Sequence, residues 1–400
     1  MRFLGEDIFL KSNLLFFIPF FMFLGVTGQL LGLVFFFFFL LTNSKNKDFL
    51  KISFLFFLLW LIFPIWNLGH FFFGKGGELT VSQIFSSHTA SSALVMSLGF
   101  CVVFFSKKKN QQTCHSEKFF FRGLLCALFF LAVYVVFQYV FGFDYRHDNF
   151  RLPDQDRFNG TYFRAYGLYG HPLSLSSVML AILGYVCVLL EGARENKKEL
   201  IFICVLSFII LLLTGSRAPA FIACFFLFVF FVRKLPIFFL LLGTTVAFVA
   251  FYYIGIFSRV LELFSFENFS EFPRFVFWKV HALMFLDSPF FGHSYAAVSS
   301  FLRDEYYELA GFGDYFIKYS AHNVYLEFLV ELGFVGSFFV GIILYFLLFF
   351  LKKNARSQLF FYAFLLALGL NMIHGLTQNT FFDANLFSAY LYLYILSSIT

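Results

Sequence analysis

The stretch LTGSRAP, residues 213–219, lies inside a long apolar run and organises the rest of the chain. The run covers 33 residues, from Leu200 to Val232, and Arg217 is its only charged residue. One membrane-spanning helix needs about 20 apolar residues and two need about 40, so 33 residues are tight for two. Gly215 and Pro219 favour a turn here, and the sequence therefore predicts a short helical hairpin.

The tip of so short a hairpin would barely reach the far interface, which leaves Arg217 at or just below the lipid headgroups. A guanidinium at that depth is costly unless it has a partner. Ser216 can cap the second helix, and Pro219 suits its first turn. A helix N-terminus beside an arginine is an anion site suited to phosphate. The alternative is an arginine that snorkels to the interface without a specific ligand.

The composition is that of a polytopic membrane protein. Of the 400 residues, 60% are hydrophobic and 13% are charged, and the mean hydropathy is +0.82. Apolar runs long enough to span a bilayer recur between short charged loops. The first run is too long for the apolar region of a cleavable signal peptide. The net charge of +6 is spread over loops and does not indicate binding of nucleic acid.

Eleven or twelve spans follow from these runs, because residues 14–41 can form one tilted helix or two short ones. With twelve spans and both ends inside, 17 of the 29 Lys and Arg residues fall in inside segments. This bias agrees with the positive-inside rule, so we favour twelve. The other predicted spans are residues 50–70, 84–105, 119–142, 172–190, 200–213, 218–232, 236–256, 323–351, 358–374 and 384–400.

Two regions divide the chain. Residues 1–160 hold the N-terminal spans and the first long outer loop, and residues 161–400 hold the hairpin (200–232), a second outer loop (257–322) and the C-terminal spans. Loops of this length in compact proteins are usually functional, so we expect the chemistry on the outer face. Two stretches of the second loop are amphipathic enough to form helices on the membrane interface, residues 274–287 and 296–310.

Motifs for metal or nucleotide chemistry are missing from the sequence. It contains no CxxC or HExxH, and no P-loop or GxGxxG in a usable context. Five of the six cysteines lie in apolar runs, so an exported disulfide framework is not indicated. We therefore expect no metal ion and no cofactor.

The segment SAHNVYLEFLVELGFVG, residues 320–336, begins outside and enters a predicted span. Asn323, Glu327 and Glu331 recur at four-residue spacing, so they share one helical face. Glu331 would lie about 12 Å deeper than Asn323, where a carboxylate needs an inward-facing arginine. His322 at the interface can act as a general base near neutral pH. The alternative is a histidine that only caps or packs a helix.

Two further arginines stand beside glycine-rich or aromatic motifs. Arg274 begins one predicted interfacial helix, with Trp278 one turn later and PFFG at 289–292. Its alternative role is contact with lipid headgroups. Arg164 opens the motif RAYGLYGHP, residues 164–172, just before a span.

These segments resemble the O-antigen ligase and polymerase family of bacterial envelope glycosyltransferases. The most specific one has His-Asn, nine residues, Gly, two residues and Gly. The first 150 residues match only as generic spans. Four segments carry the likeness, RAYGLYGHP (164–172), TGSRAPA (214–220), R-x-x-x-W followed by PFFG (274–292) and HNVYLEFLVELGFVG (322–336).

The resemblance implies an all-α, GT-C-like fold of about twelve transmembrane helices around a periplasmic cavity in the bacterial inner membrane. Family members transfer a glycan from undecaprenyl pyrophosphate to an acceptor hydroxyl without metal or nucleotide. The resemblance implies that Arg217 and Arg274 bind the donor pyrophosphate and that His322 activates or orients the acceptor hydroxyl. It also implies substrate-binding positions at Arg164, Asn323 and Glu331.

The sequence departs from the family pattern in two places. Gly292-His293-Ser294 stands where many members have Gly-x-Gly, and Leu173 stands where an Asn is common. Neither change removes an expected catalytic group, but both could reshape the loop that selects substrate.

The expected function is that of a ligase that joins a lipid-linked O-antigen to lipid A–core. The alternative is a polymerase with a growing glycan as acceptor; its usual Arg-x10-Gly spacing is missing from the long loops. A protein O-glycosyltransferase is usually longer. A lipid-linked oligosaccharide transporter would need inverted repeats and charges midway along several spans. A scaffold without activity would not need Arg217 and His322 together.

Overall fold

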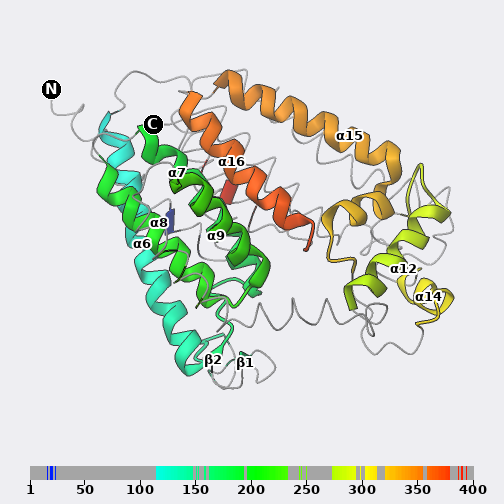
Figure 1. Ribbon diagram of the computed structural model, residues 1–400. Coiled ribbons are helices and arrows are strands. Elements are labelled where there is room, and N and C mark those ends of the chain that lie inside the picture. Colours follow the sequence, from blue (N-terminus) through cyan, green and yellow to red (C-terminus); the bar gives the residue numbers. More distant parts are fainter. Residues whose placement is uncertain are drawn as a thin grey trace.

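The structure is a computed structural model that describes residues 114–146, 162–192, 196–232, 273–293, 302–312, 320–354 and 358–378, with isolated residues elsewhere. These ranges are mostly helical (Figure 1). The predicted spans at 14–41, 50–70, 84–105, 236–256 and 384–400 lie wholly or mostly outside the described residues. The helices are α6 (Cys114–Phe141), α7 (Pro172–Gly192), α8 (Lys197–Leu213), α9 (Arg217–Phe231), α12 (Pro273–Asp287), α14 (Arg303–Leu309), α15 (Val324–Asn354) and α16 (Gln358–Gly375).

In the part of the chain that the structure describes, four helices are long and apolar enough to cross a membrane. They are Lys118–Phe141, Pro172–Gly192, Val324–Ile342 and Gln358–Gly375. The predicted polytopic, helical architecture is confirmed at this level. The total of twelve spans and the GT-C-like arrangement stay predictions.

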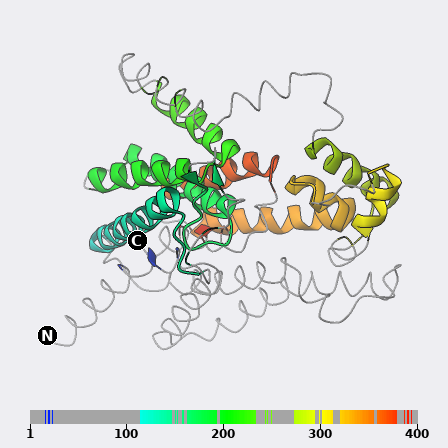
Figure 2. The ribbon, with the colours of Figure 1, turned by 90° about the horizontal axis from the view of Figure 1, so that it is seen from below.

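Helices α8 and α9 confirm the predicted hairpin. They have 17 and 15 residues, which corresponds to about 25 and 22 Å of helix, shorter than a hydrocarbon core of about 30 Å. Gly215 has φ 62°, in the left-handed region that favours glycine. Figure 2 shows that α9 begins close to α16 and then diverges from the other helices of the bundle.

Thr214, rather than Ser216, orders the hairpin turn. Ser216 occupies the N-cap position of α9, but its side chain makes no capping hydrogen bond, so the predicted serine cap is wrong. The Thr214 hydroxyl donates to the carbonyl of Leu211 at 2.7 Å and accepts from the Ser216 N–H at 3.2 Å. The Thr214 hydroxyl lies at the end of α8, closer than the Ser216 hydroxyl. It donates a hydrogen bond to one of the last carbonyls of that helix.

Helix α7 lies antiparallel to α16 at the centre of the described bundle. The absence of a side chain at Gly184 lets α7 approach Ala367 and Leu370 of α16 closely. Near the start of α7, the Ser177 hydroxyl lies 3.1 Å from Nδ1 of His374, near the end of α16. The end of α16 therefore lies beside the start of α7, at the same end of the bundle as the hairpin turn. We call this end of the bundle the turn end.

The predicted span 323–351 is broken rather than continuous. α15 is interrupted at Gly333, whose φ of 62° and ψ of −171° are accessible almost only to glycine. Figure 1 shows the resulting sharp change of direction in α15. Glu331 lies near the end of the short first segment, and its predicted depth of about 12 Å below Asn323 concerns only this unbroken part, so it stays a prediction.

The turn after α12 supplies the hydrogen bonds that this break removes. The His293 N–H donates to the carbonyl of Val330 at 2.8 Å. The N–H of Phe334 donates to the carbonyl of Pro289 at 2.8 Å, and the N–H of Val335 donates to Phe290 at 3.0 Å. Buried backbone groups need such partners, so residues 289–293 stabilise both halves of α15. We call residues 289–293 together with Gly333 the glycine clasp.

Gly333→Ala is expected to destabilise the protein by on the order of 3 kcal/mol or more. The new Cβ would lie 2.6 Å from the backbone nitrogen of Gly292, which itself has φ 67°. Thermal unfolding of the detergent-solubilised protein measures the effect. Gly341→Ala is the matched control in the same helix, because no described atom outside the surrounding turns of that helix lies within 4 Å of its Cβ position. Equal melting temperatures for both variants would contradict the clasp.

Two details of the long outer loops differ from the predictions, a short β-hairpin in an otherwise helical protein and the length of one helix. The first long loop contains a two-stranded antiparallel hairpin, β1 (Arg157–Phe158) and β2 (Tyr162–Phe163). The intervening sequence includes Asn159-Gly160, a strong hairpin signal. The second predicted interfacial helix is described as α14 only from Arg303 to Leu309, whereas α12 matches its predicted range closely.

Candidate functional site

The first long loop packs directly on the hairpin turn that carries Arg217. The N–H of Ala165 donates to the carbonyl of Leu213 at 3.2 Å. The Nε of Arg164 donates to the carbonyl of Thr214 at 3.4 Å. Arg164 and Arg217 are therefore brought to one turn, although they are 53 positions apart in the sequence.

Gln138 holds this loop in place from the last turn of α6. Its Oε1 accepts the N–H groups of Tyr166 at 3.1 Å and Gly167 at 2.7 Å, and its Nε2 donates to the Gly167 carbonyl at 3.0 Å. The side chain is fully buried. Gln138 was not predicted as a functional residue, because a single glutamine in an apolar helix gives no sign of its partners.

Arg146 is the second support of the loop. Its guanidinium donates to the carbonyls of Gly167 and Tyr169, each at 3.0 Å, and pairs with the buried Asp144 at 2.9 Å. Burial opposes ionisation of Asp144, but the hydrogen bonds from Arg146 outweigh it and lower the pKa of that carboxyl. Gln138 and Arg146 together fix the backbone that presents Arg164.

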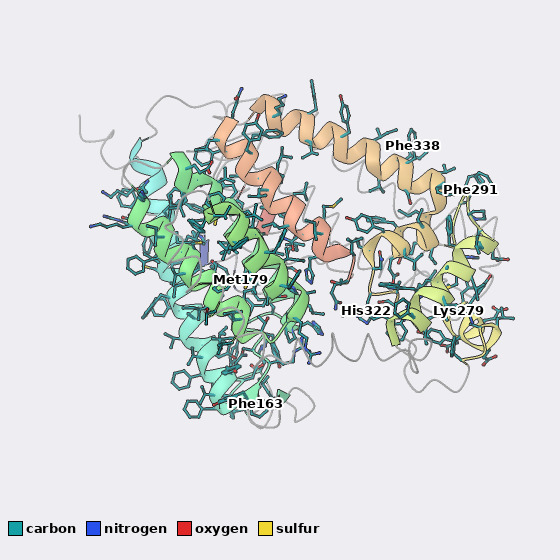
Figure 3. All side chains as sticks on the ribbon, in the orientation of Figure 1. Phe163, Met179, Lys279, Phe291, His322 and Phe338 are labelled. Atoms are coloured by element: carbon teal, nitrogen blue, oxygen red, sulfur yellow. The ribbon has the colours of Figure 1, made fainter. Side chains whose placement is uncertain are left out.

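His322 lies at the same turn end, between the end of α16 and α12 (Figure 3). Its Nδ1 is 3.1 Å from Oε1 of Gln378, just after α16. The hydroxyl of Tyr325 also donates to the carbonyl of Met372 in α16. An amide oxygen can only accept, so Nδ1 carries the hydrogen and Nε2 keeps its lone pair. Gln378 could not be identified from the sequence beyond its place near the end of a span.

Arg274 approaches this histidine from α12. The guanidinium is half-buried and interacts electrostatically with His322 and with His374. The ring of Phe277, one turn later, lies 5.8 Å from the His322 imidazole, centroid to centroid. Arg274 and His322 are therefore brought together, while their action on one substrate stays a prediction.

The environment keeps His322 neutral. Burial lowers the pKa of His322 below its usual 6.5, the Gln378 hydrogen bond opposes this shift, and Arg274 adds to the lowering. A neutral imidazole with a lone pair on Nε2 can accept a proton from a hydroxyl group.

The pH dependence of activity should reflect this lowered pKa. Protonation of His322 would remove the acceptor at Nε2, so activity should fall on acidification. The midpoint of the acidic limb should lie below 6.5, the usual histidine value. Initial rates between pH 4 and pH 8, with protein integrity checked at each pH, give this midpoint. A midpoint above 6.5 would mean that His322 titrates as an exposed or anion-paired histidine.

Asn323 is half-buried, and the two glutamates of α15 are buried. The Oδ1 of Asn323 caps α15 by accepting the N–H groups of Tyr325 and Leu326 at 3.0 and 3.2 Å. Glu327 and Glu331 are 5% and 4% exposed. They share one face, as predicted, and Arg303 of α14 is the arginine that interacts with Glu331. The sequence predicted an arginine partner but did not identify which one.

Among the described residues, no group of three or more His, Cys, Asp or Glu side chains is arranged to hold a metal ion. The polar groups at the turn end are instead arginines, a neutral histidine and amides. Such a set suits an anionic ligand and a hydroxyl group.

The helical architecture with several candidate spans in the described residues is that of a polytopic membrane protein. Residues 202–340 match the model of a family described as O-antigen ligase. Residues 202–340 are thus similar to the O-antigen ligase family, which confirms the resemblance for this part of the chain. No curated protein matches the chain. The matched region contains Arg217, Arg274, His322, Asn323 and Glu331.

Proposed function

We propose that this protein is an O-antigen ligase that transfers a glycan from undecaprenyl pyrophosphate to lipid A–core at the periplasmic face of the bacterial inner membrane. The observation that carries the proposal is the electrostatic interaction of Arg274 with a neutral His322. Both lie at the turn end of the bundle, where the hairpin carries Arg217. The acceptor glycolipid, the lipid-linked donor and surrounding membrane lipid are the partners of this reaction.

Arg217 supplies the first part of the donor site. It is the first residue of α9, where the N–H groups of Arg217 and Ala218 have no acceptor within the helix, whereas Pro219 has no N–H and Ala220 donates to the carbonyl of Ser216. These N–H groups and the guanidinium favour a phosphate, and Arg164 adds a second positive charge at the same turn. A pyrophosphate that leaves during transfer gains negative charge, which Arg217 and Arg274 would stabilise in place of a metal ion.

The depth of the site supports a donor that is attached to a lipid. Leu286, Phe290 and Phe291 are 68%, 63% and 59% exposed at the end of α12 and in the glycine clasp. They adjoin the start of the second half of α15, where Phe338 is 67% exposed on a candidate span (Figure 3). Large exposed apolar side chains gathered in this way favour contact with lipid. The same α12 carries Arg274, so its guanidinium would lie near the headgroups, where a carrier lipid holds its pyrophosphate.

The reaction follows from these positions. The acceptor hydroxyl donates its proton to Nε2 of His322, and its oxygen attacks the anomeric carbon of the donor glycan. The bond between that carbon and the pyrophosphate oxygen breaks, and its electrons stay on the pyrophosphate. In-line attack inverts the anomeric configuration, as the family resemblance implies. We propose that Asn323 and Glu331 contribute through the position of α15, since Asn323 caps it and Glu331 is buried.

The alternative is a polymerase that uses the same donor and a growing glycan as acceptor. Deletion of the protein, followed by analysis of where the glycan accumulates, distinguishes the two. Long chains left on the lipid carrier are expected for a ligase. Single repeats attached to lipid A–core would mean a polymerase. Unchanged glycosylated lipopolysaccharide would contradict both.

A further inference from the structure

His322 has an unusual backbone conformation. Its φ is 48°, and among the described residues only His322 and Phe150 have positive φ without being glycine. A non-glycine residue in this region is strained, and the strain persists only where surrounding contacts enforce it. Residues with such strain cluster at functional sites, so the contacts that hold His322 are of interest.

The residue before His322 is held from both sides. Oε1 of Glu327 accepts the N–H of Ala321 at 2.6 Å. The indole Nε1 of Trp278 donates to the carbonyl of Ala321 at 3.0 Å. Ala321 is fully buried, and its two hydrogen bonds come from different helices, α15 and α12. The peptide that leads into His322 therefore has little freedom to rotate.

Glu327 is itself fixed by its surroundings. It is 5% exposed, and Nε2 of the fully buried His281 lies 3.7 Å from Oε1. Burial lowers the pKa of His281, which is therefore neutral at physiological pH. Its Nδ1 is 2.8 Å from the carbonyl of Phe277, so the ring is anchored to α12. The carboxylate is thus held by packing between α12 and α15, beside Glu331.

We propose that Glu327 and Trp278 are positioning residues that clamp Ala321, hold His322 in its left-handed conformation and so aim its imidazole at the acceptor hydroxyl. The clamp rests on the proposed function, because it assigns a purpose to the orientation of His322. It requires a hydrogen-bond acceptor at position 327, and it does not require a negative charge there.

The substitutions Glu327→Gln and Glu327→Leu test this requirement. Gln keeps an oxygen that can accept the Ala321 N–H, whereas Leu of similar size cannot. Glu327→Leu is expected to lower kcat by about 100-fold with KM nearly unchanged, because a displaced catalytic group reduces the rate of the chemical step. Glu327→Gln should stay within a few-fold of the wild type. Glu308→Leu, at an exposed position of α14, is the matched control and should leave the rate unchanged.

A second pair tests whether the two residues act on the same peptide. Trp278→Phe removes the donor to the Ala321 carbonyl but keeps an aromatic ring. If both residues hold one conformation of His322, the double variant Trp278→Phe/Glu327→Leu should be about as slow as the slower single variant. Multiplicative losses would mean that the residues act independently and would overturn a shared clamp. Melting temperatures identify any variant that loses activity by unfolding.

The results separate the clamp from the proposed function. A folded Glu327→Leu variant with wild-type kcat overturns the clamp. Equal loss in the folded Gln and Leu variants also overturns it, because the charge would then be the required property. In both cases His322→Ala remains inactive if the proposed function holds. Normal transfer by His322→Ala would instead refute the proposed role of His322, whatever the clamp variants do.

Discussion

Arg217→Lys should lose activity by about 100-fold or more, although the charge is kept. Lysine presents a point charge on a flexible stem and cannot form the planar, two-pronged contact that an arginine makes with phosphate oxygens. Arg217 is the first residue of a helix, so its guanidinium and the first-turn N–H groups favour the same anion. Transfer of glycan from the lipid-linked donor in membranes, normalised to the amount of folded protein, measures the loss.

Arg122→Lys is the matched control for this substitution. Arg122 is 51% exposed and lies 3.9 Å from Glu199, in the first turn of α8 and thus at the end opposite the hairpin turn. Exposed pairs contribute about 0–1 kcal/mol, so this variant should transfer glycan normally. A normal rate in Arg217→Lys would show that Arg217 only snorkels to the interface.

His322→Ala should reduce transfer by about 100-fold to 10,000-fold, the usual contribution of a positioned general base. The substitution removes Nε2, whose lone pair the Gln378 contact leaves available. Because His322 is half-buried and at the end of α15 rather than within it, the fold should remain intact. Membrane insertion and melting temperature verify this, and the rate at saturating donor measures the chemical step.

His171→Ala is the corresponding control. His171 is exposed, and its Nδ1 accepts the N–H of Leu173 in a turn, so its role is structural and local. Its loss should leave the rate nearly unchanged. If His322→Ala keeps the wild-type rate while folded, then His322 only packs against α12 and α16.

The sequence predicted the elements whose causes are local. Apolar runs, Gly215 and Pro219 were sufficient to predict the α8–α9 hairpin, and its short helices agree with the 33-residue run. The face shared by Glu327 and Glu331 also follows from helical spacing alone. The four segments that resemble the family indicated the residues of the candidate site, because each segment is a short, contiguous pattern.

The contacts between distant segments could not be predicted. Gly333 reads as an ordinary glycine in a helical run, and only the backbone of residues 289–293 explains why the helix breaks there. Gln138 and Gln378 are single amides in apolar surroundings, and their roles depend on partners 28 and 56 positions away. Glu327 was predicted only to share a helical face with Asn323 and Glu331, and its contact with Ala321 depends on the conformation of the chain at His322.

The most direct test of a metal-independent glycan transfer is a reaction in proteoliposomes. The purified protein is reconstituted with lipid-linked glycan and lipid A–core, in the presence of a chelator and without nucleotide. The expected result is glycosylated lipid A–core together with released undecaprenyl pyrophosphate in equal amounts, and neither product with Arg217→Ala. Transfer that needs added metal or nucleotide, or wild-type yield from the folded Arg217→Ala protein, would contradict the proposed mechanism.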